Sequence, residues 1–454
     1  MPQTIHFISI GGSAMHNLAL ALQHQGNTIT GSDDEIYEPS LTRLQHHGLL
    51  PAQMGWFPEK ITPQLDAVIL GMHARADNPE LLRAQELGLP IFSYPEFIYQ
   101  HSRQKQRVVI AGSHGKTTIT ALILHVLRYH KRTFDYLVGA QIDGFDTMVS
   151  LTESAPLIVI EGDEYASSPI DPRPKFLHYQ PHIALISGIA WDHVNIYPTW
   201  DLYVDQFESL AEAMPKAGIL VFDDSDNMLD VIGQKDRPDI TKIPYQAHPN
   251  EIVEGKTYLL PKKGGRVPVL IFGEHNMKNI AGAMTVCDRI GITDDQFYEA
   301  VSSFRGAARR LETVAQRDGR ILFRDFAHAP SKVEATTEAV RTQFPGKSLV
   351  AVVELHTFSS LNKDFLGQYK GTLDAADKAA VYINRHTLES RGQGAFSRDD
   401  IRAAFGRDDL ELFFEPADLQ QYLLGQRTTA DLFLLMSSGN FSGLDLQQLA
   451  TTLL

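Results

Sequence analysis

The sequence predicts an α/β protein of three domains, each built around a mainly parallel sheet. The first reason is that apolar, strand-like runs alternate with turns and helix-like segments along the whole chain, a pattern typical of parallel sheets. The second is length, because 454 residues imply two to four domains at roughly 100–200 residues each. The third is composition: 43% hydrophobic and 21% charged residues are ordinary proportions for globular domains.

The first predicted domain, residues 1–106, has the order of a Rossmann-like unit. Its expected elements are a strand at 5–10, a turn at Gly11-Gly12, a helix at 17–23, and strands at 28–30, 67–70 and 90–92. The acidic pair Asp33-Asp34 stands about where such a unit carries its ribose-binding carboxylate. The polar stretch 101–107 predicts the connection to the next domain.

Two further α/β series are predicted in residues 107–310 and 311–454. The central series has the phosphate-loop ATPase type of order, with expected strands at 108–111, 157–160 and 183–186, helices at 119–129 and 276–290, and a hairpin insertion within 254–272. The last series is predicted to be a second Rossmann-like domain, with strands at 321–326, 349–354, 379–383, 411–414 and 432–436.

The sharpest chemical signal lies between the strand at 108–111 and the helix at 119–129. It reads Gly112-Ser113-His114-Gly115-Lys116-Thr117-Thr118. Glycines let backbone N–H groups curl around an anion, and the helix N-terminus adds a favourable dipole. Lys116 is therefore expected at the β- and γ-phosphates of a nucleotide, and the Thr117 hydroxyl at Mg²⁺. The general pattern has four residues between its glycines; this loop has two, so we predict a shortened phosphate loop.

Polar residues follow two more strands of the central series. Glu161 ends the strand at 157–160, and Asp192-His193 follows the strand at 183–186. Parallel sheets bind ligands at the carboxyl ends of their strands. A carboxylate and an imidazole beside a nucleotide would suit divalent metal ions that bridge phosphate oxygens.

Composition excludes several classes of function. The formal net charge of −14 argues against nucleic-acid binding, and no block of Lys and Arg supplies a basic patch. The single cysteine, Cys287, rules out a disulfide framework. The start Met1 to His6 lacks the basic region of a secretory signal, and no apolar run approaches the roughly 18–20 residues that span a bilayer. We expect a cytoplasmic protein with small-molecule substrates; its oligomeric state is left open.

The phosphate loop and the segments around it resemble the ATP-dependent Mur ligases of bacterial peptidoglycan synthesis and recycling. The resemblance extends over nearly the whole chain and implies ATP and Mg²⁺ as cofactors. It makes Lys116, Glu161, His193 and Arg310 catalytic, with Thr117, Glu161 and His193 as metal ligands. It adds further ATP-binding positions to the loop residues Gly112 to Thr118, namely His275 and Asn276 near the adenine, Asn279, Arg310 and Asp325.

Segments near the two ends of the chain indicate which branch of the family this sequence resembles. The segment Gly11-Gly12-Ser13-Ala14-Met15, together with Ser32 and Asp33, resembles the turn of UDP-N-acetylmuramate binders, although Ser9 replaces the first glycine of that pattern. The segment Met436 to Gly443 is similar to that of the murein peptide ligases. It implies peptide contacts at Ser438, Gly439, Phe441 and His356, where His356 stands in place of a usual arginine.

The resemblance implies that ATP converts the lactyl carboxylate of UDP-N-acetylmuramate to an acyl phosphate, which the amine of the tripeptide L-Ala-γ-D-Glu-meso-diaminopimelate then attacks. Three alternatives stay open. One is a ligase that adds free L-alanine to the same acid. The others are a phosphate-loop ATPase that serves as a binding module, and a nicotinamide-dependent oxidoreductase based on the Gly11-Gly12 turn.

Overall fold

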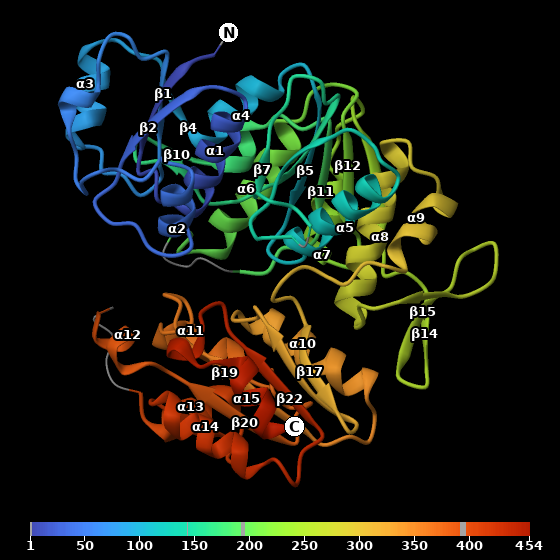
Figure 1. Ribbon diagram of the computed structural model, residues 1–454. Helices are drawn as coiled ribbons and strands as arrows, with labels where there is room; N and C mark the ends of the chain where they lie inside the picture. The colour runs from blue at the N-terminus through green and yellow to red at the C-terminus, as the bar shows by residue number, and fades with distance from the viewer. Residues whose placement is uncertain (1, 143, 192–195, 391–395) are drawn as a thin grey trace.

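The computed structural model describes residues 2–142, 144–191, 196–390 and 396–454, and it contains three α/β units. Figure 1 shows the N-terminal unit (blue) beside the central unit (green), with the C-terminal unit (orange to red) beneath them. Each unit holds a mainly parallel sheet, so the α/β fold class predicted from the sequence is confirmed. None of the helices in these described ranges is both long and apolar enough to cross a membrane.

The N-terminal sheet is wholly parallel. Its strands run in the order β2 (Thr28–Ser32), β1 (Thr4–Ile8), β3 (Ala67–Leu70) and β4 (Ile91–Ser93). Its helices are α1 (Ser13–His24), α2 (Ser40–His46), α3 (Pro79–Glu86) and α4 (Tyr94–Ser102), with a short turn η1 (Pro58–Lys60). The helix expected at 17–23 starts four residues earlier, because Gly12 is already its N-cap.

The central sheet lies under the phosphate loop. Its order is β13 (Thr241–Tyr245), β12 (Ile219–Asp223), β11 (Ile183–Ile186), β5 (Gln106–Ala111), β8 (Leu157–Glu161), β6 (Asp135–Leu137) and β7 (Val149–Ser150). Only β7 pairs antiparallel within this sheet as described. The associated helices are α5 (Lys116–Tyr129), α6 (Trp200–Glu212), α7 (Asn227–Gln234), α8 (Glu274–Arg289) and α9 (Asp294–Val301). A small hairpin, β9 (Ala166–Ser168) with β10 (Asp171–Pro174), leads into the turn η2 (Lys175–His178).

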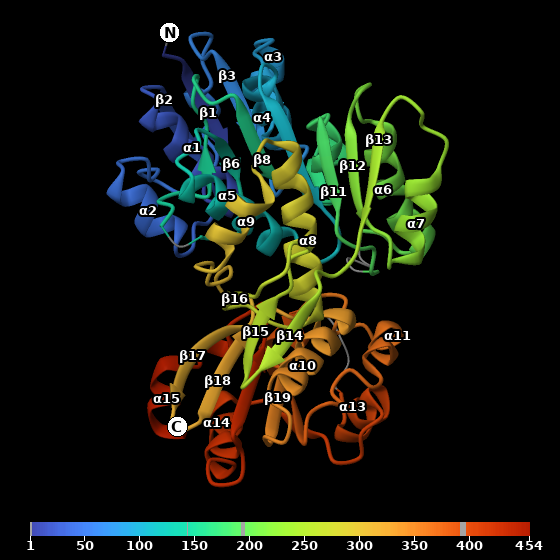
Figure 2. The same cartoon turned by 90° about the vertical axis from the view of Figure 1, so that its right-hand side faces the viewer.

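The predicted hairpin insertion is confirmed as a three-stranded antiparallel sheet. Its strands are β14 (Asn250–Val253), β15 (Lys256–Leu259) and β16 (Val267–Val269), so it begins slightly before the expected range. Figure 2 shows it between the central and C-terminal units. The Thr257 hydroxyl donates to Gln343 Oε1 at 2.9 Å, and Gln343 donates to the Gly255 carbonyl at 2.7 Å. These two bonds attach the insertion to the C-terminal unit.

The connection expected at 101–107 is shorter than predicted, and its charges are buried. Helix α4 runs to Ser102 and β5 starts at Gln106, which leaves three residues between them. The Arg107 guanidinium donates to the carbonyls of Ser102 at 2.9 Å and Tyr179 at 2.8 Å. Lys105 is buried in an ion pair with Asp135. The polar sequence therefore marks a junction held by satisfied charges, because isolated buried cations would be costly.

The C-terminal sheet is covered on both faces. Its order is β17 (Glu312–Arg317), β18 (Arg320–Asp325), β22 (Leu432–Met436), β19 (Leu349–Glu354), β20 (Lys378–Tyr382) and β21 (Glu411–Phe413), with β17 antiparallel. Around it lie α10 (Pro330–Gln343), α11 (Lys363–Leu366), η3 (Gly367–Tyr369), α12 (Arg385–Ser390), α13 (Arg398–Phe405), α14 (Pro416–Gly425), η4 (Phe441–Gly443) and α15 (Leu446–Leu453). Separate apolar clusters on the two faces explain why these strands read as continuous apolar runs.

Candidate active site

The predicted phosphate loop connects β5 to α5, and its two glycines have no room for a side chain. Gly112 has φ 124° and Gly115 has φ 76°, both in the region that favours glycine. A Cβ on Gly112 would lie 2.4 Å from Ser187 Oγ, and one on Gly115 would lie 2.3 Å from Asn279 Oδ1. Gly115 is the N-cap of α5, so Lys116 and Thr117 occupy the first turn of the helix. The loop thus presents a helix N-terminus, which favours an anion.

Ser113 and Ser187 fix the underside of this loop. The Ser113 hydroxyl lies 3.0 Å from Tyr203 OH and accepts from the Ala190 N–H at 2.8 Å. The Ser113 N–H donates to the Gly188 carbonyl at 2.9 Å, and the Ser187 hydroxyl donates to the His114 carbonyl. The loop after β11 is therefore the wall that holds the phosphate loop in shape, and the Ser113 side chain faces that wall.

Lys116 lies across the mouth of the loop and is held by two acceptors. Its Nζ donates to the Gly112 carbonyl at 2.6 Å and to Glu164 Oε2 at 2.8 Å. Burial lowers the pKa of Lys116, but the nearby carboxylates, Glu164 first among them, outweigh it and leave the pKa above its usual value. Glu164 is not among the site residues predicted from the sequence, although it lies three residues after Glu161. The structure makes it the counter-ion of Lys116.

Thr117, Glu161 and Arg310 come together from three parts of the chain. The Thr117 hydroxyl donates to Glu161 Oε1 at 2.7 Å, and the Gly139 N–H donates to Glu161 Oε2 at 2.8 Å. Arg310 Nη2 lies 3.4 Å from the Thr117 hydroxyl. Hydroxyl and carboxylate oxygens are hard donors of the kind Mg²⁺ prefers, so this pair fits the expected ion. His193, the third expected metal ligand, lies outside the described residues.

Arg310 is placed by the segment that links the central and C-terminal units. Its guanidinium lies 4.2 Å from the centre of the Phe326 ring. Burial lowers its pKa, with Asp325 and Glu161 opposing the shift. Asp325 accepts from the Ala327 N–H at 2.6 Å and from the Leu311 N–H, so its oxygens hold the backbone beside Arg310. The expected contact between Asp325 and the nucleotide stays a prediction.

The start of α8 packs on the phosphate loop through the expected ATP-binding residues. Asn276 donates to the Phe272 carbonyl at 2.8 Å, and Asn279 donates to Asn276 Oδ1 at 3.2 Å. Burial lowers the pKa of His275 to about 4, and its Nδ1 is buried without a hydrogen-bond partner among the described residues. That orphaned nitrogen beside the loop is consistent with a nucleotide site. Thr118 is buried within α5.

His114 is a neutral, half-buried side chain of the loop. A Cβ on Gly188 would lie 2.2 Å from His114 Cε1, so the ring packs against the loop after β11. Burial lowers the pKa of His114 to about 4, and the positive charge of Lys332 adds to this effect. The imidazole is therefore uncharged at neutral pH and supplies no cation to the site.

Asp223 and Lys278 form a further charged pair at the same sheet edge, and neither residue is among the predicted site residues. Lys278 Nζ lies 3.3 Å from Asp223 Oδ2 and donates to Ser225 Oγ at 2.6 Å. Asp223 ends β12, a strand that was not predicted. The sequence position of Lys278 could have indicated the pair, because Lys278 lies between Asn276 and Asn279, two of the predicted ATP-binding residues on α8.

The N-terminal turn is held by Asp33. The Gly11 N–H donates to Asp33 Oδ2 at 2.7 Å, and a Cβ on Gly11 would lie 2.9 Å from that oxygen. Ser9 has φ 68°, the conformation for which the related pattern uses glycine. The other expected UDP-sugar residues divide into two groups. Met15 and Ser32 are buried, with Ser32 accepting from Lys60 Nζ at 3.0 Å, whereas Ser13 and Ala14 are exposed and Gly12 is half-buried.

Asp33 is expected to make stability depend on pH. Burial raises its pKa to about 6, against the opposing hydrogen bond from the Gly11 N–H. A raised folded-state pKa gives stability that is present below about pH 4 and lost as pH rises through about 6. Asp33→Asn should therefore gain on the order of 1–3 kcal/mol relative to the parent protein between these pH values. Chemical unfolding across that range checks this, with the exposed Glu35→Gln as control; a constant difference between D33N and the parent would contradict it.

The expected peptide-contact residues surround Glu354 at the end of β19. Glu354 is buried and accepts from the Ser437 hydroxyl and from the Phe441 N–H at 2.8 Å. His356 Nε2 lies 3.4 Å from Ser438 Oγ, and the Arg309 side chain donates to the Gly439 carbonyl. The Phe441 side chain is buried in the core, so only its backbone serves this loop.

Glu354 is expected to stabilise the 437–441 loop. Phe441 and Ser442 have φ 51° and 56°, so the turn needs a fixed acceptor to hold it. Glu354→Ala leaves a buried N–H and a hydroxyl unpaired and should lower the free energy of unfolding by about 1–3 kcal/mol. Glu354→Gln keeps an acceptor and should lose much less. Urea midpoints of the two variants test this, and equal midpoints would contradict it.

Comparisons with known proteins agree with this fold. Residues 4–106 match the family described as Mur ligase family, catalytic domain, and residues 110–287 match the Mur ligase middle domain. The UDP-N-acetylmuramate–L-alanine ligase of Caldicellulosiruptor bescii is 32% identical over 83% of this chain and 82% of its own length. The UDP-N-acetylmuramate–L-alanyl-gamma-D-glutamyl-meso-2,6-diaminoheptandioate ligase of Escherichia coli is 29% identical over 77% of this chain and 78% of its own length.

A solved structure resembles the whole chain. It is a murein peptide ligase from Psychrobacter arcticus, which covers 99% of this chain and 98% of its own with a TM-score of 0.67 at 23% identity. Fold, site and relatives together define an ATP-dependent ligase that forms carbon–nitrogen bonds. The chain belongs to the Mur ligase family. The oxidoreductase and the stand-alone ATPase readings are thereby set aside.

Proposed function

We propose that this ligase joins UDP-N-acetylmuramate to the tripeptide L-Ala-γ-D-Glu-meso-diaminopimelate, in peptidoglycan recycling. The observation that carries the ligase chemistry is the convergence of Lys116, Thr117 and Arg310 on one helix N-terminus. Arg310 reaches it from the end of the central unit, 193 residues along the chain from Thr117. We propose the domain boundaries 1–106, 107–310 and 311–454 for the UDP-sugar, ATP and peptide modules.

The chemistry requires two anions to meet. A carboxylate oxygen of UDP-N-acetylmuramate attacks the γ-phosphorus of ATP, the bond to ADP breaks, and an acyl phosphate forms. The amine nitrogen of the acceptor then attacks the acyl carbon, phosphate leaves with the bonding electrons, and the amine loses a proton. Coulomb repulsion between carboxylate and triphosphate opposes the first step, so cations at the meeting point lower its barrier.

The residues divide this work between them. Lys116 and Arg310 provide fixed positive charge, and the N–H groups at the start of α5 face the phosphates. Thr117 and Glu161 would hold Mg²⁺, which supplies further charge neutralisation when it is bound. Ser113, Ser187 and the neutral His114 keep the loop in shape. Gly11, Gly12 and Asp33 would bind the UDP-sugar, as proposed from the N-terminal pattern.

Two candidate functions differ in the amine acceptor, which is either the tripeptide or free L-alanine. The tripeptide is favoured by the segment Met436 to Gly443, which resembles the peptide ligases, and by the Escherichia coli relative, whose name carries that tripeptide. Free L-alanine is favoured by the Caldicellulosiruptor relative, named an L-alanine ligase, at slightly higher identity. His356 adjoins the 437–441 loop, so we propose that it contacts the acceptor.

ADP release distinguishes these acceptors. Purified full-length protein receives ATP, Mg²⁺ and UDP-N-acetylmuramate, with either the tripeptide or L-alanine. The proposal expects release that depends on the tripeptide, and a His356→Ala variant whose KM rises for the tripeptide but not for UDP-N-acetylmuramate. Release with L-alanine alone would overturn the assignment of the acceptor and leave the ligase chemistry intact.

A further inference from the structure

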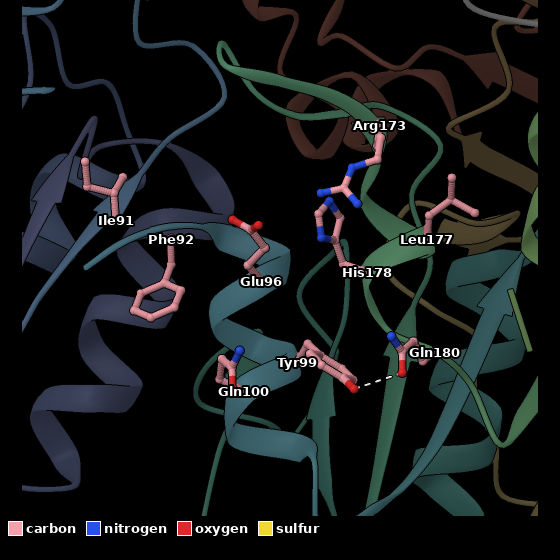
Figure 3. A pocket seen from close by; sticks show the side chains of 9 residues that line it. All are labelled: Ile91, Phe92, Glu96, Tyr99, Gln100, Arg173, Leu177, His178 and Gln180. Atoms are coloured by element: carbon pink, nitrogen blue, oxygen red, sulfur yellow. Dashed lines mark hydrogen bonds between the residues drawn. The ribbon is translucent and has the colours of Figure 1, made fainter. Parts of the chain in front are cut away.

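A group of potential metal ligands, none of them in the phosphate loop, lies where the N-terminal unit meets the central unit. Glu96 is on α4, Asp171 is on β10 and His178 ends η2, and one ligand atom from each lies within 4.8 Å of the others. Glu96 and His178 line a pocket of about 320 Å³. Figure 3 shows the Glu96 carboxylate and the His178 ring on the two sides of this pocket.

His178 has a buried ring nitrogen that makes no hydrogen bond to any described residue. Its side chain is only 6% exposed, and Nε2 lies 3.2 Å from Asp171 Oδ2. The geometry between them is not that of a hydrogen bond, so Nε2 is unpartnered among the described residues. A buried polar atom without a partner is costly. A cation seated between this nitrogen and the carboxylates would satisfy both sides.

We propose that Glu96, Asp171 and His178 form a binding site for Zn²⁺ that clamps the N-terminal unit to the central unit. Two carboxylates and a neutral imidazole balance a divalent charge. A nitrogen ligand favours Zn²⁺ over the Mg²⁺ of the active site, which prefers oxygen. The adjoining pocket leaves space for a water molecule as a fourth ligand.

The groups next to the three proposed ligands fit a site in which a metal ion replaces the Arg173 guanidinium. The Glu96 carboxylate is oriented by Ser93, whose N–H and hydroxyl both donate to Oε2 at 2.8 Å. Asp171 is paired with Arg173, whose Nη2 lies 2.6 Å from Oδ2. The Arg173 side chain is 61% exposed, so it can move into solvent when a metal ion takes its place. Arg173 is thus a competitor for the site, and its removal should strengthen metal binding.

Zn²⁺ titration of the full-length protein tests the proposal. Chelator-treated protein in excess Mg²⁺ is titrated with ZnCl₂ by calorimetry. We expect one Zn²⁺ per chain, an affinity at least about tenfold weaker in His178→Gln and Glu96→Gln, and a tighter affinity in Arg173→Gln. Gln at position 96 can still cap α4, so that variant should keep its fold. His101→Gln, a histidine on the same helix outside the cluster, is the matched control and should bind like the parent protein.

The predicted changes in Zn²⁺ affinity have opposite signs in the different variants, which makes the outcome decisive. Weaker binding in H178Q and E96Q together with tighter binding in R173Q supports the site. Absence of Zn²⁺ uptake in excess Mg²⁺, equal affinity in H178Q and the parent, or weaker binding in R173Q would overturn it. Arg173 lies at the surface, so R173Q keeps the test decisive even if H178Q fails to fold. ADP release is not the readout, so this result is independent of the proposed ligase substrates.

Discussion

Lys116→Met should lower kcat/KM for ligation by at least about two orders of magnitude. Its Nζ donates to the Gly112 carbonyl of the glycine turn at 2.6 Å. Losing one preorganised charge at the reacting phosphate is worth about 3 kcal/mol or more of transition-state stabilisation. Steady-state ADP release with saturating UDP-N-acetylmuramate measures the effect.

Stability must be separated from catalysis in this variant. Lys116→Met removes the cation that is paired with the buried Glu164 carboxylate, and breaking a buried ion pair costs about 3–5 kcal/mol. The double variant Lys116→Met/Glu164→Gln removes both charges and should recover most of that loss. It should remain as inactive as the single variant. If activity returned together with stability, Lys116 would be a structural residue and not the phosphate-binding cation.

Arg310→Ala is expected to have the second largest effect, about 100- to 1,000-fold in kcat/KM. The guanidinium reaches the Thr117 hydroxyl from the linking segment and rests on the Phe326 ring. It is thus the cation that the end of the central unit adds to the loop. Arg310→Lys keeps the charge but loses the planar fork, so we expect partial activity.

Arg309 is the matched control for Arg310. It is next in the chain, but its side chain donates to the Gly439 carbonyl. Arg309→Ala should therefore change the KM of the acceptor more than the KM of ATP, whereas Arg310→Ala should affect the ATP-dependent step with either acceptor. Single-turnover formation of ADP, followed for both variants, distinguishes these outcomes; identical profiles would contradict the assigned roles.

Much of the fold could be predicted from the sequence because its strands are buried on both faces. Strands such as β11 and β22 are continuous apolar runs, and their predicted bounds match the structure. Strand β17 was missed because Glu312–Arg317 is a polar edge strand with no such run. Strand β12 is apolar, yet it was not predicted. For that reason Asp223, which ends this strand, was not predicted as a site residue either.

The site could be predicted where its residues are neighbours in the chain. Gly112 to Thr118 is local, so its loop geometry follows from the glycine and helix signals. The pairing of Lys116 with Glu164, and of Arg310 with Thr117, depends on how strands and units are arranged in space. Asp325 shows the same limit, because its place in a motif could not reveal that backbone N–H groups occupy its oxygens.

The central claim is that ATP activates the sugar carboxylate at the loop that carries Lys116. It is tested most directly with UDP-N-acetylmuramate whose carboxylate oxygens carry a heavy isotope. During ligation, one labelled oxygen should appear in the released inorganic phosphate, and the Lys116→Met/Glu164→Gln variant should release none above background. Unlabelled phosphate formed at the rate of ligation would contradict the account, because the carboxylate would then never have bonded to the γ-phosphorus.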